Sequence, residues 1–300
     1  MVKKIFFAGM ILLAASCSNE SELNEVINSE KATAPVTVRV NGFSITQEDF
    51  PSGGTRAEQD VADYDAVKVL TLAFYDGSTE VYKTTQKRFE SSTYTTFGEF
   101  TCNLPIGSYT MVVIGYGYWA NGDEIVLTSP TMAGYTSDWA RETFCYTQVV
   151  NITSAEPVNL NATLNRIVAQ LQVISTDNRV EGVSKIRTTY SAGSKSFNPT
   201  TGLATSNTGF SVTNSPSAAV GSTVNFGSFV FLATDEQTVN ITLEVLDANE
   251  AVMFTRYVPN VPLRRNRQTT LSGAVFTSFA ATSSAFQLET SWLDGNTVNF

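Results

Sequence analysis

The sequence contains no histidine among its 300 residues. Histidine is the usual general base near neutral pH and the commonest metal ligand, so its absence excludes most hydrolase triads and most zinc sites. The chain also lacks a Gly-x-Ser-x-Gly elbow, a Ser-x-x-Lys pair, a Gly-Lys-Ser/Thr phosphate loop and a Cys-x-x-Cys pair. We therefore expect no enzyme activity, no metal site and no cofactor.

Positive charge is sparse as well. The chain has 19 Lys and Arg against 28 Asp and Glu, a net charge of -9. Nucleic-acid binding needs a basic surface, so we expect no nucleic-acid partner. The acidic residues Glu58, Asp60, Asp63 and Asp65 have neither the spacing of a calcium loop nor that of a recognisable glycosidase pair, and a solvated linker explains them more simply.

The first residues have the pattern of a lipoprotein signal peptide. Lys3 and Lys4 precede an apolar run, Ile5 to Leu13, which is too short to span a bilayer and ends in Ala14-Ala15-Ser16-Cys17. This resembles a bacterial lipobox, which predicts a signal over residues 1–16 and a lipid on Cys17. The alternative is an ordinary signal peptide that is cut elsewhere. Residues 17–34 are polar and acidic, which indicates a tether.

The remaining chain predicts an all-β protein. It is rich in Thr, Ser, Val, Phe and Tyr and is interrupted by Gly and Pro at short intervals, which favours many short strands. About 280 residues fit two domains better than one. We expect two β-sandwich domains in tandem, residues 35–157 and 158–300.

The strand pattern is clearest at the beginning of the mature chain. Val36, Val38 and Val40 alternate with polar residues as in a half-buried strand that continues to Ile45. The next segment, 51–58, reads as an exposed flexible loop. Further strands are expected over 66–75, 97–104, 108–114, 144–152, 164–173 (with a short helix as the alternative), 223–232, 238–246, 251–258 and 269–276. A loop is expected over 120–141, and a hairpin excursion or a long loop over 191–217.

The end of the chain also alternates, and we expect a strand-forming tail over 285–300. Its apolar residues are Phe286, Leu288, Trp292, Val298 and Phe300. This tail either pairs within its own domain or is available to another chain. Beyond Cys17, Cys102 and Cys145 form a disulfide or remain two buried free thiols, since an exported protein permits either.

Four local motifs together resemble the fimbrillin superfamily of Bacteroidales, the subunits of type V pili. They are Leu104-Pro105-x-Gly107-x-Tyr109, Gly54-Thr55-Arg56-Ala57, Leu164-x-Arg166 with Ala169, and Val261-Pro262-Leu263-Arg264-Arg265-Asn266-x-Gln268-Thr269. The chain is short for a stalk subunit of this superfamily.

The resemblance implies two transthyretin-like β-sandwich domains in a lipoprotein of the cell outer membrane that is exposed on the surface as part of a fimbrium. It implies that an arginine-specific protease cuts between Arg56 and Ala57 and releases the leading strand with Val36, Val38 and Val40. A strand from another subunit, in a homopolymer or a mixed fibre, then fills the groove, and the tail is the donor. An anchor subunit would instead keep its leading strand.

A second class of function stays open at this point. A monomeric surface lipoprotein could bind glycans through Trp119, Tyr135 and Trp139 in the loop-rich part of the first half. Arg264, Arg265 and Arg267 suggest either a patch for an acidic ligand or, more simply, a solvated turn.

Overall fold

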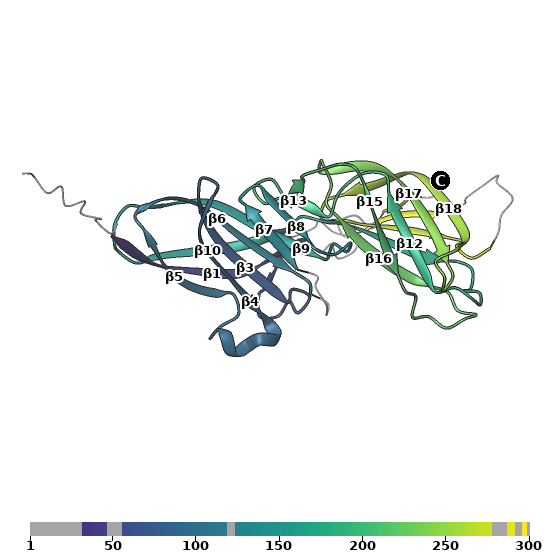
Figure 1. Cartoon of the computed structure of the whole chain (residues 1–300), viewed down its shortest axis with the longest axis horizontal. Helices are drawn as coiled ribbons and strands as arrows, with labels where there is room; N and C mark the ends of the chain where they lie inside the picture. Colours follow the sequence, from purple (N-terminus) through teal and green to yellow (C-terminus); the bar gives the residue numbers. More distant parts are fainter. Residues whose placement is uncertain (1–31, 47–55, 119–123, 278–286, 292–295, 299–300) are drawn as a thin grey trace, which may run out of the picture. The chain divides into compact units, whose positions relative to one another are not determined.

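The computed structural model describes residues 32–46, 56–118, 124–277, 287–291 and 296–298 (Figure 1). Regular structure in them is almost entirely β, with a short 3-10 helix, η1 (Arg88–Thr93). The expected all-β class is confirmed. Among the described residues, none of the helices has the length and apolar character needed to cross a membrane. The signal 1–16, Cys17 and most of the tether lie outside the described residues.

The largest sheet contains the beginning of the mature chain. Every pairing in it is antiparallel except the one between β1 and β10, which is parallel. Its order is β2 (Arg56–Asp60), β1 (Thr33–Thr46), β10 (Val158–Arg166), β9 (Thr143–Ile152), β6 (Gly107–Tyr116), β3 (Val69–Asp76) and β4 (Thr79–Lys87), and β5 (Glu99–Pro105) pairs with β1.

Three smaller sheets follow (Figure 1). One has the order β16 (Asn225–Val230), β11 (Ala169–Ser175), β19 (Gln268–Gly273), β20 (Gln287–Ser291) and β21 (Asn296–Val298). The next has the order β15 (Phe210–Asn214), β12 (Lys185–Tyr190), β17 (Glu236–Leu246) and β18 (Val252–Arg264). The last has the order β14 (Leu203–Ala204), β13 (Ser196–Asn198), β8 (Met132–Tyr135) and β7 (Ile125–Ser129).

The continuous apolar run of β3 is explained by burial on both faces. Leu70, Leu72 and Phe74 belong to the core of the first half, whereas Val69 and Tyr75 face a separate apolar cluster. A strand covered on both sides needs no polar face, so its sequence does not alternate. The expectation of a central strand over 66–75 is confirmed.

The separate apolar cluster that Val69 and Tyr75 face, called the third cluster below, contains residues from distant parts of the sequence. Phe197 and Phe231 stack with ring centroids 4.5 Å apart, and both pack in the same cluster as Ala133 and Tyr135 of β8. A further core cluster contains residues of both the β11 sheet and the β17 sheet. Residues 32–300 form one compact unit by their contacts.

A stretch expected to be a loop contains strands, since residues 120–141 include β7 and β8. Residues 191–217, expected as a hairpin excursion or a long loop, include β13, β14 and β15, and β13 pairs with β14 as a hairpin. These strands are short, and β8 also pairs with the distant β13, so local alternation does not reveal them. The helix alternative for 164–173 is wrong, and the strand expected there is two strands, β10 and β11.

β10 was expected to open the second half, but its backbone pairs with β1 and β9 in the first sheet. The chain passes from one set of sheets to the next at Ile167 and Val168, both buried.

Candidate strand-exchange site

β1 lies inside the first sheet, hydrogen-bonded on both sides. On one side Val36 to Ser44 run parallel to Val158 to Asn165 of β10. On the other side Thr33 to Arg39 pair with β5, and Gly42 to Thr46 pair with β2, both antiparallel. A segment that replaced β1 would therefore find backbone partners along both of its edges.

A bulge in β1 changes which of its alternate side chains point into the core. Ala34, Val36, Val38 and Val40 are at most 3% exposed, and after Asn41 the next buried side chain is Phe43. The pairing with β10 shifts register between Val40 and Gly42, so one extra residue is inserted there. A bulge reverses which alternate residues face inward, which lets one strand keep its apolar face over its whole length.

These side chains fill a continuous apolar groove in the core of the first half. Burying a Val or Phe side chain is worth about 1.5 to 3 kcal/mol, so three valines and Phe43 contribute on the order of 10 kcal/mol before ordering costs. Removing β1 would expose that surface together with two rows of backbone groups.

Phe43 occupies an aromatic box at the end of this groove. Its ring centroid lies 4.9 Å from that of Phe144 and 5.5 Å from that of Tyr64. Gly115 of β6 makes room for it, because a Cβ at that position would lie 3.1 Å from the Phe43 ring and 3.1 Å from Leu70.

A buried ionic cluster lies against this box. Arg166 and Glu142 form an ion pair of 2.5 Å with side chains only 4% and 13% exposed. Arg166 also donates to the Tyr64 hydroxyl at 3.0 Å, and Tyr64 donates to Glu142 at 2.7 Å. Burial, with the Glu142 charge, raises the pKa of Tyr64, so its hydroxyl stays protonated and keeps donating.

The motifs that carry the resemblance have structural roles here. In Leu104-Pro105-x-Gly107-x-Tyr109, the Tyr109 hydroxyl folds back and donates to the Pro105 carbonyl at 2.8 Å. A Cβ at Gly107 would lie 2.9 Å from that hydroxyl, so the turn needs glycine. Arg166 organises the ionic cluster.

The motif at 261–269 is a turn between strands. Asn266 has a left-handed φ of 59°, accepts a hydrogen bond from Arg166 at 3.1 Å, and its backbone N–H donates to the Val168 carbonyl at 2.8 Å. Thr269 donates to the Pro262 carbonyl at 2.8 Å. The motif thus fixes the turn against the junction that follows β10.

Arg56 and Ala57 were expected in an exposed loop, and this is wrong for their backbone. They begin β2, where Arg56 pairs with Thr46 and Ala57 with Ile45. Proteases need an extended segment that is free of other backbone partners, so cleavage here requires the end of this hairpin to open. Residues 47–55 lie outside the described residues.

The tail pairs with its own chain in this structure. β20 runs antiparallel to β19, Gln268 opposite Ser291 through Ser272 opposite Gln287, and β21 pairs with β20 at the edge of the sheet. Leu288 and Val298 lie in these two strands and face each other in register. Phe286, Trp292 and Phe300 lie outside the described residues.

Sequence reasoning missed a carboxylate that fixes residues 275–277, which follow β19 and precede the tail. Asp177 accepts the backbone N–H of Val275 on one oxygen and that of Phe276 on the other, both at 2.7 Å. It also accepts the Thr277 hydroxyl at 3.1 Å. Val275 and Phe276 are buried. A lone aspartate near a strand end gives no sequence signal for this role.

Cys102 and Cys145 are free thiols, so the disulfide alternative is not realised. Cys102 packs against the core of the first half. Cys145 belongs to the third cluster, which lies on the opposite face of the first sheet. Cys145 donates to the Pro199 carbonyl at 3.5 Å. Burial raises the pKa of Cys102 to about 11 and that of Cys145 to about 12.

Of the aromatic residues proposed for glycans, Tyr135 and Trp139 lie in the described residues, and Tyr135 is not on the surface. Tyr135 is buried and hydrogen-bonded to the Thr143 hydroxyl at 2.8 Å. Trp139 is half-buried with the Arg141 guanidinium 4.8 Å from its ring centroid. Trp119 lies outside the described residues. The glycan hypothesis therefore loses Tyr135.

The acidic residues 58–65 do not form a metal site in the described residues, where no group of three or more ligating side chains occurs. Asp60 accepts the Ala62 backbone N–H at 2.8 Å, which is a turn. Asp65 pairs with Lys68 at 2.5 Å, and this hydrogen bond and charge lower the pKa of Asp65.

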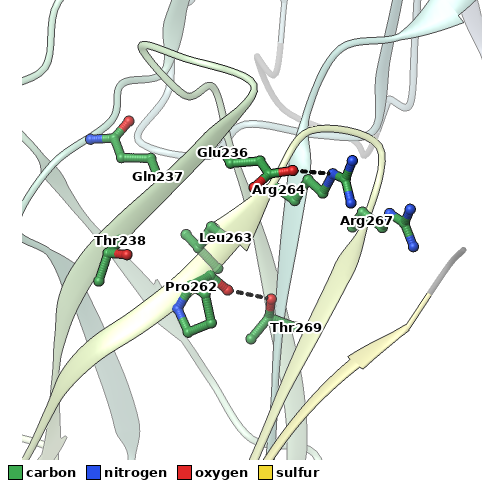
Figure 2. Close-up of a pocket in the computed structure, with 8 residues that line it drawn as sticks. All are labelled: Glu236, Gln237, Thr238, Pro262, Leu263, Arg264, Arg267 and Thr269. Atoms are coloured by element: carbon green, nitrogen blue, oxygen red, sulfur yellow. Dashed lines mark hydrogen bonds and ion pairs between the residues drawn. The ribbon is translucent and has the colours of Figure 1, made fainter. Parts of the chain in front are cut away.

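Two of the three arginines near 265, Arg264 and Arg265, are paired with acidic residues. Figure 2 shows Arg264 facing Glu236 beside a pocket of about 250 Å³, with 2.8 Å between Arg264 Nε and Glu236 Oε1. Arg265 pairs with Asp235 at 2.6 Å. These internal ion pairs favour the interpretation as a solvated turn over an acidic-ligand patch.

The fold defines an all-β protein whose first strand lies inside a sheet and whose last strands lie at the edge of another. A family model described as a family of unknown function, DUF6562, matches residues 32–292, and the chain belongs to this family. No curated protein matches the sequence.

Solved structures with a similar fold come from Bacteroidales. A "putative adhesin" from Bacteroides ovatus is 11% identical with a TM-score of 0.51, covering 85% of this chain and 96% of that chain. The fimbrial anchor protein Mfa2 from Porphyromonas gingivalis is 12% identical with a TM-score of 0.46, covering 89% of this chain and 100% of that one. The likeness to the putative adhesin shows a shared fold.

Proposed function

We propose that the protein is a non-enzymatic structural subunit of a cell-surface fimbria that assembles by strand exchange and supports adhesion. The observation that carries this proposal is the position of β1. It is the first strand of the described chain, yet it lies between β10 and the pair β5 and β2. A single covalent connection, through residues 47–55, joins it to everything that follows.

The proposed sequence of events begins with lipid attachment at Cys17 and export to the outer membrane. An arginine-specific protease then cuts between Arg56 and Ala57, which releases β1 and leaves residues 57–60 of β2 behind. The groove of the processed subunit accepts the tail of another subunit, of the same or a different kind. The names of the similar structures, an adhesin and a fimbrial anchor protein, support a role at the cell surface.

For the fold we propose two transthyretin-like sandwich domains in tandem. The strand pairing supports a division after Arg166, at Ile167 and Val168, because β10 completes the first sheet and β11 begins the next. This is nine residues later than the division at 157 and 158 expected from sequence.

A second candidate is a fimbrial anchor subunit. The backbone pairing of Arg56 inside β2 favours it, since an anchor keeps its leading strand and has no need of an accessible cut. Its lipid at Cys17 would hold it in the outer membrane. The two roles differ in the N-terminal residue of the protein on the cell surface: Ala57 in a processed stalk, and lipidated Cys17 in an anchor.

The test uses the chain from Ser18 onward, without lipid, treated with an arginine-specific protease. We expect a new N-terminus at Ala57 and a ladder of oligomers that resists mild denaturant. Arg56→Gln is the matched control and stays monomeric. Protein that is cut after Arg56, loses residues 18–56 and remains monomeric contradicts the stalk role.

A further inference from the structure

A polar cleft of about 520 Å³ lies between β4, η1 and β5. Eight of its eleven lining residues carry a hydroxyl: the two tyrosines Tyr82 and Tyr94, and six threonines. No lysine or arginine lines it, and its one carboxylate, Glu99, is paired with Arg39 at 3.3 Å. The volume is in the range of about 300 to 1,000 Å³ that is usual for small-molecule sites.

The cleft exists because two strand edges approach each other without forming a ladder. Within the described residues, β4 pairs with β3 and β5 pairs with β1. The Gln86 side chain bridges the gap: its carbonyl oxygen accepts the Gly98 N–H and its amide donates to the Glu99 carbonyl, both at 2.7 Å. Gln86 is only 5% exposed, so this bridge holds the walls of the cleft at a fixed distance.

The same bridge argues against a peptide strand as the occupant. Three backbone groups on this side are already used: the Gly98 N–H and the Glu99 carbonyl by Gln86, and the Thr101 carbonyl by the Tyr82 hydroxyl at 3.5 Å. A strand added to this edge would have to displace both side chains. The cleft is therefore closed to pairing through the backbone and open to a ligand that bonds to side-chain hydroxyls.

We propose that this cleft binds a neutral oligosaccharide. A hydroxyl can both donate and accept, which matches the hydroxyls of a sugar, and the absence of a lining cation disfavours phosphate, sulfate or carboxylate ligands. Thr93 and Tyr82 already donate to the Glu90 and Thr101 carbonyls and so are left as acceptors, and Thr85 shares a hydrogen bond with Thr71. Tyrosine offers an apolar ring for the C–H face of a sugar and a polar end for its hydroxyls. The Tyr94 ring is steadied by Phe97, with centroids 5.7 Å apart.

The site differs from the aromatic set expected from sequence, and it does not depend on strand exchange. Its signal in the sequence is the run from Thr93 to Thr96, three threonines and a tyrosine that begin at the last residue of η1. This run lines the cleft together with Thr84 and Thr85 of β4.

The experiment applies the purified chain from Ser18 onward to an array of neutral gluco-, manno- and galacto-oligosaccharides, with sialylated and sulfated oligosaccharides beside them. We expect binding to a neutral class. Tyr94→Ala and Thr84→Val should each weaken that binding about tenfold or more. Phe89→Ala is the control, because Phe89 lies on η1, is 55% exposed and stacks with Tyr118 outside the cleft.

A second measurement does not depend on the variants and so remains informative if one of them fails to fold. Threonine methyl groups observed by NMR in the unmodified chain should shift with the bound oligosaccharide at Thr84, Thr93 and Thr95. Three results would overturn the proposal: no neutral oligosaccharide binds, acidic ones bind better, or binding leaves these methyl signals unchanged. Saturable binding of a synthetic peptide of residues 286–300 with shifts at the same methyl groups would also overturn it, in favour of strand addition.

Discussion

Val38 of β1 lies directly opposite Leu160 of β10 in a parallel pair. Parallel neighbours cannot be joined by a tight turn, and here more than a hundred residues separate them in sequence. A cut between Arg56 and Ala57 therefore detaches β1 together with only the first residue of β2 and leaves the other strands of the sheet intact. The same pair sets the direction of a replacement, which must run parallel to β10 to keep the ladder that β1 makes.

The packing of β1 against the core can be weakened by a substitution at Phe43. Phe43→Ala removes a fully buried ring from the aromatic box and should lower the free energy of unfolding by about 3 to 5 kcal/mol. Val149→Ala, at a site in β9 that is 63% exposed, should change it by less than about 0.5 kcal/mol. Denaturant unfolding measures both, and equal effects would mean that β1 is not packed as described.

The ionic cluster beside the box should matter more than exposed ion pairs. Glu142→Gln leaves Arg166 buried beside a neutral group and should cost about 3 to 5 kcal/mol of unfolding free energy. Glu250→Gln breaks an exposed pair, in which the side chains of Glu250 and Lys185 are 58% and 35% exposed, and should leave the unfolding free energy nearly unchanged. A Glu142→Gln variant as stable as Glu250→Gln would contradict the buried cluster.

The role of Asp177 in fixing residues 275–277 can be tested against a close control. Asp177→Asn keeps one acceptor oxygen where two are used, so it should cost about 1 to 3 kcal/mol and speed hydrogen exchange at Val275 or Phe276. Asp247→Asn should be nearly silent, because a single oxygen of Asp247 accepts both Asn249 and Ala251 N–H groups. Unchanged exchange in Asp177→Asn would contradict this role of Asp177.

The buried thiols predict a loss of stability in alkali. Burial raises the pKa of Cys102 and Cys145 from 9.0 to about 11 and about 12. The unfolded chain releases these protons first, so their contribution is complete below pH 9.0 and is lost as the pH rises towards 12. The double variant Cys102→Ala and Cys145→Ala should show a shallower decline of unfolding free energy just above pH 9.0, and an identical decline would rule out the thiols as its cause.

Sequence patterns predicted the strands whose buried faces show as a local pattern of apolar residues. Alternation from Val36 to Val40 and the apolar run of β3 both follow from which faces are covered. Patterns could not predict β13 or β14, which are three and two residues long and depend on partners elsewhere. The membership of β10 in the first sheet had no local signal either, because its partner β1 lies over a hundred residues away.

The candidate site divides in the same way. The strand to be displaced was visible as an alternating segment, whereas its supports, Glu142, Asp177 and Gln86, are single polar residues that look like any surface residue in a sequence. Arg56 looked exposed because Gly and Ser surround it, and its backbone pairing with Thr46 depends on how far β1 extends.

The most direct test of the account asks whether a tail from one molecule enters the groove of another. Both proteins carry Cys102→Ala and Cys145→Ala. The first carries Ala162→Cys in β10, opposite Val40 of β1. The second has a tag that increases its mass and carries a cysteine at position 286, 288 or 290 of the tail. Disulfides form only when the Cβ atoms lie about 3.5 to 4.5 Å apart. After cleavage at Arg56, we predict a disulfide between the two proteins for at least one tail position and none before cleavage. Cleaved protein that forms no such bond at any tail position would contradict strand exchange.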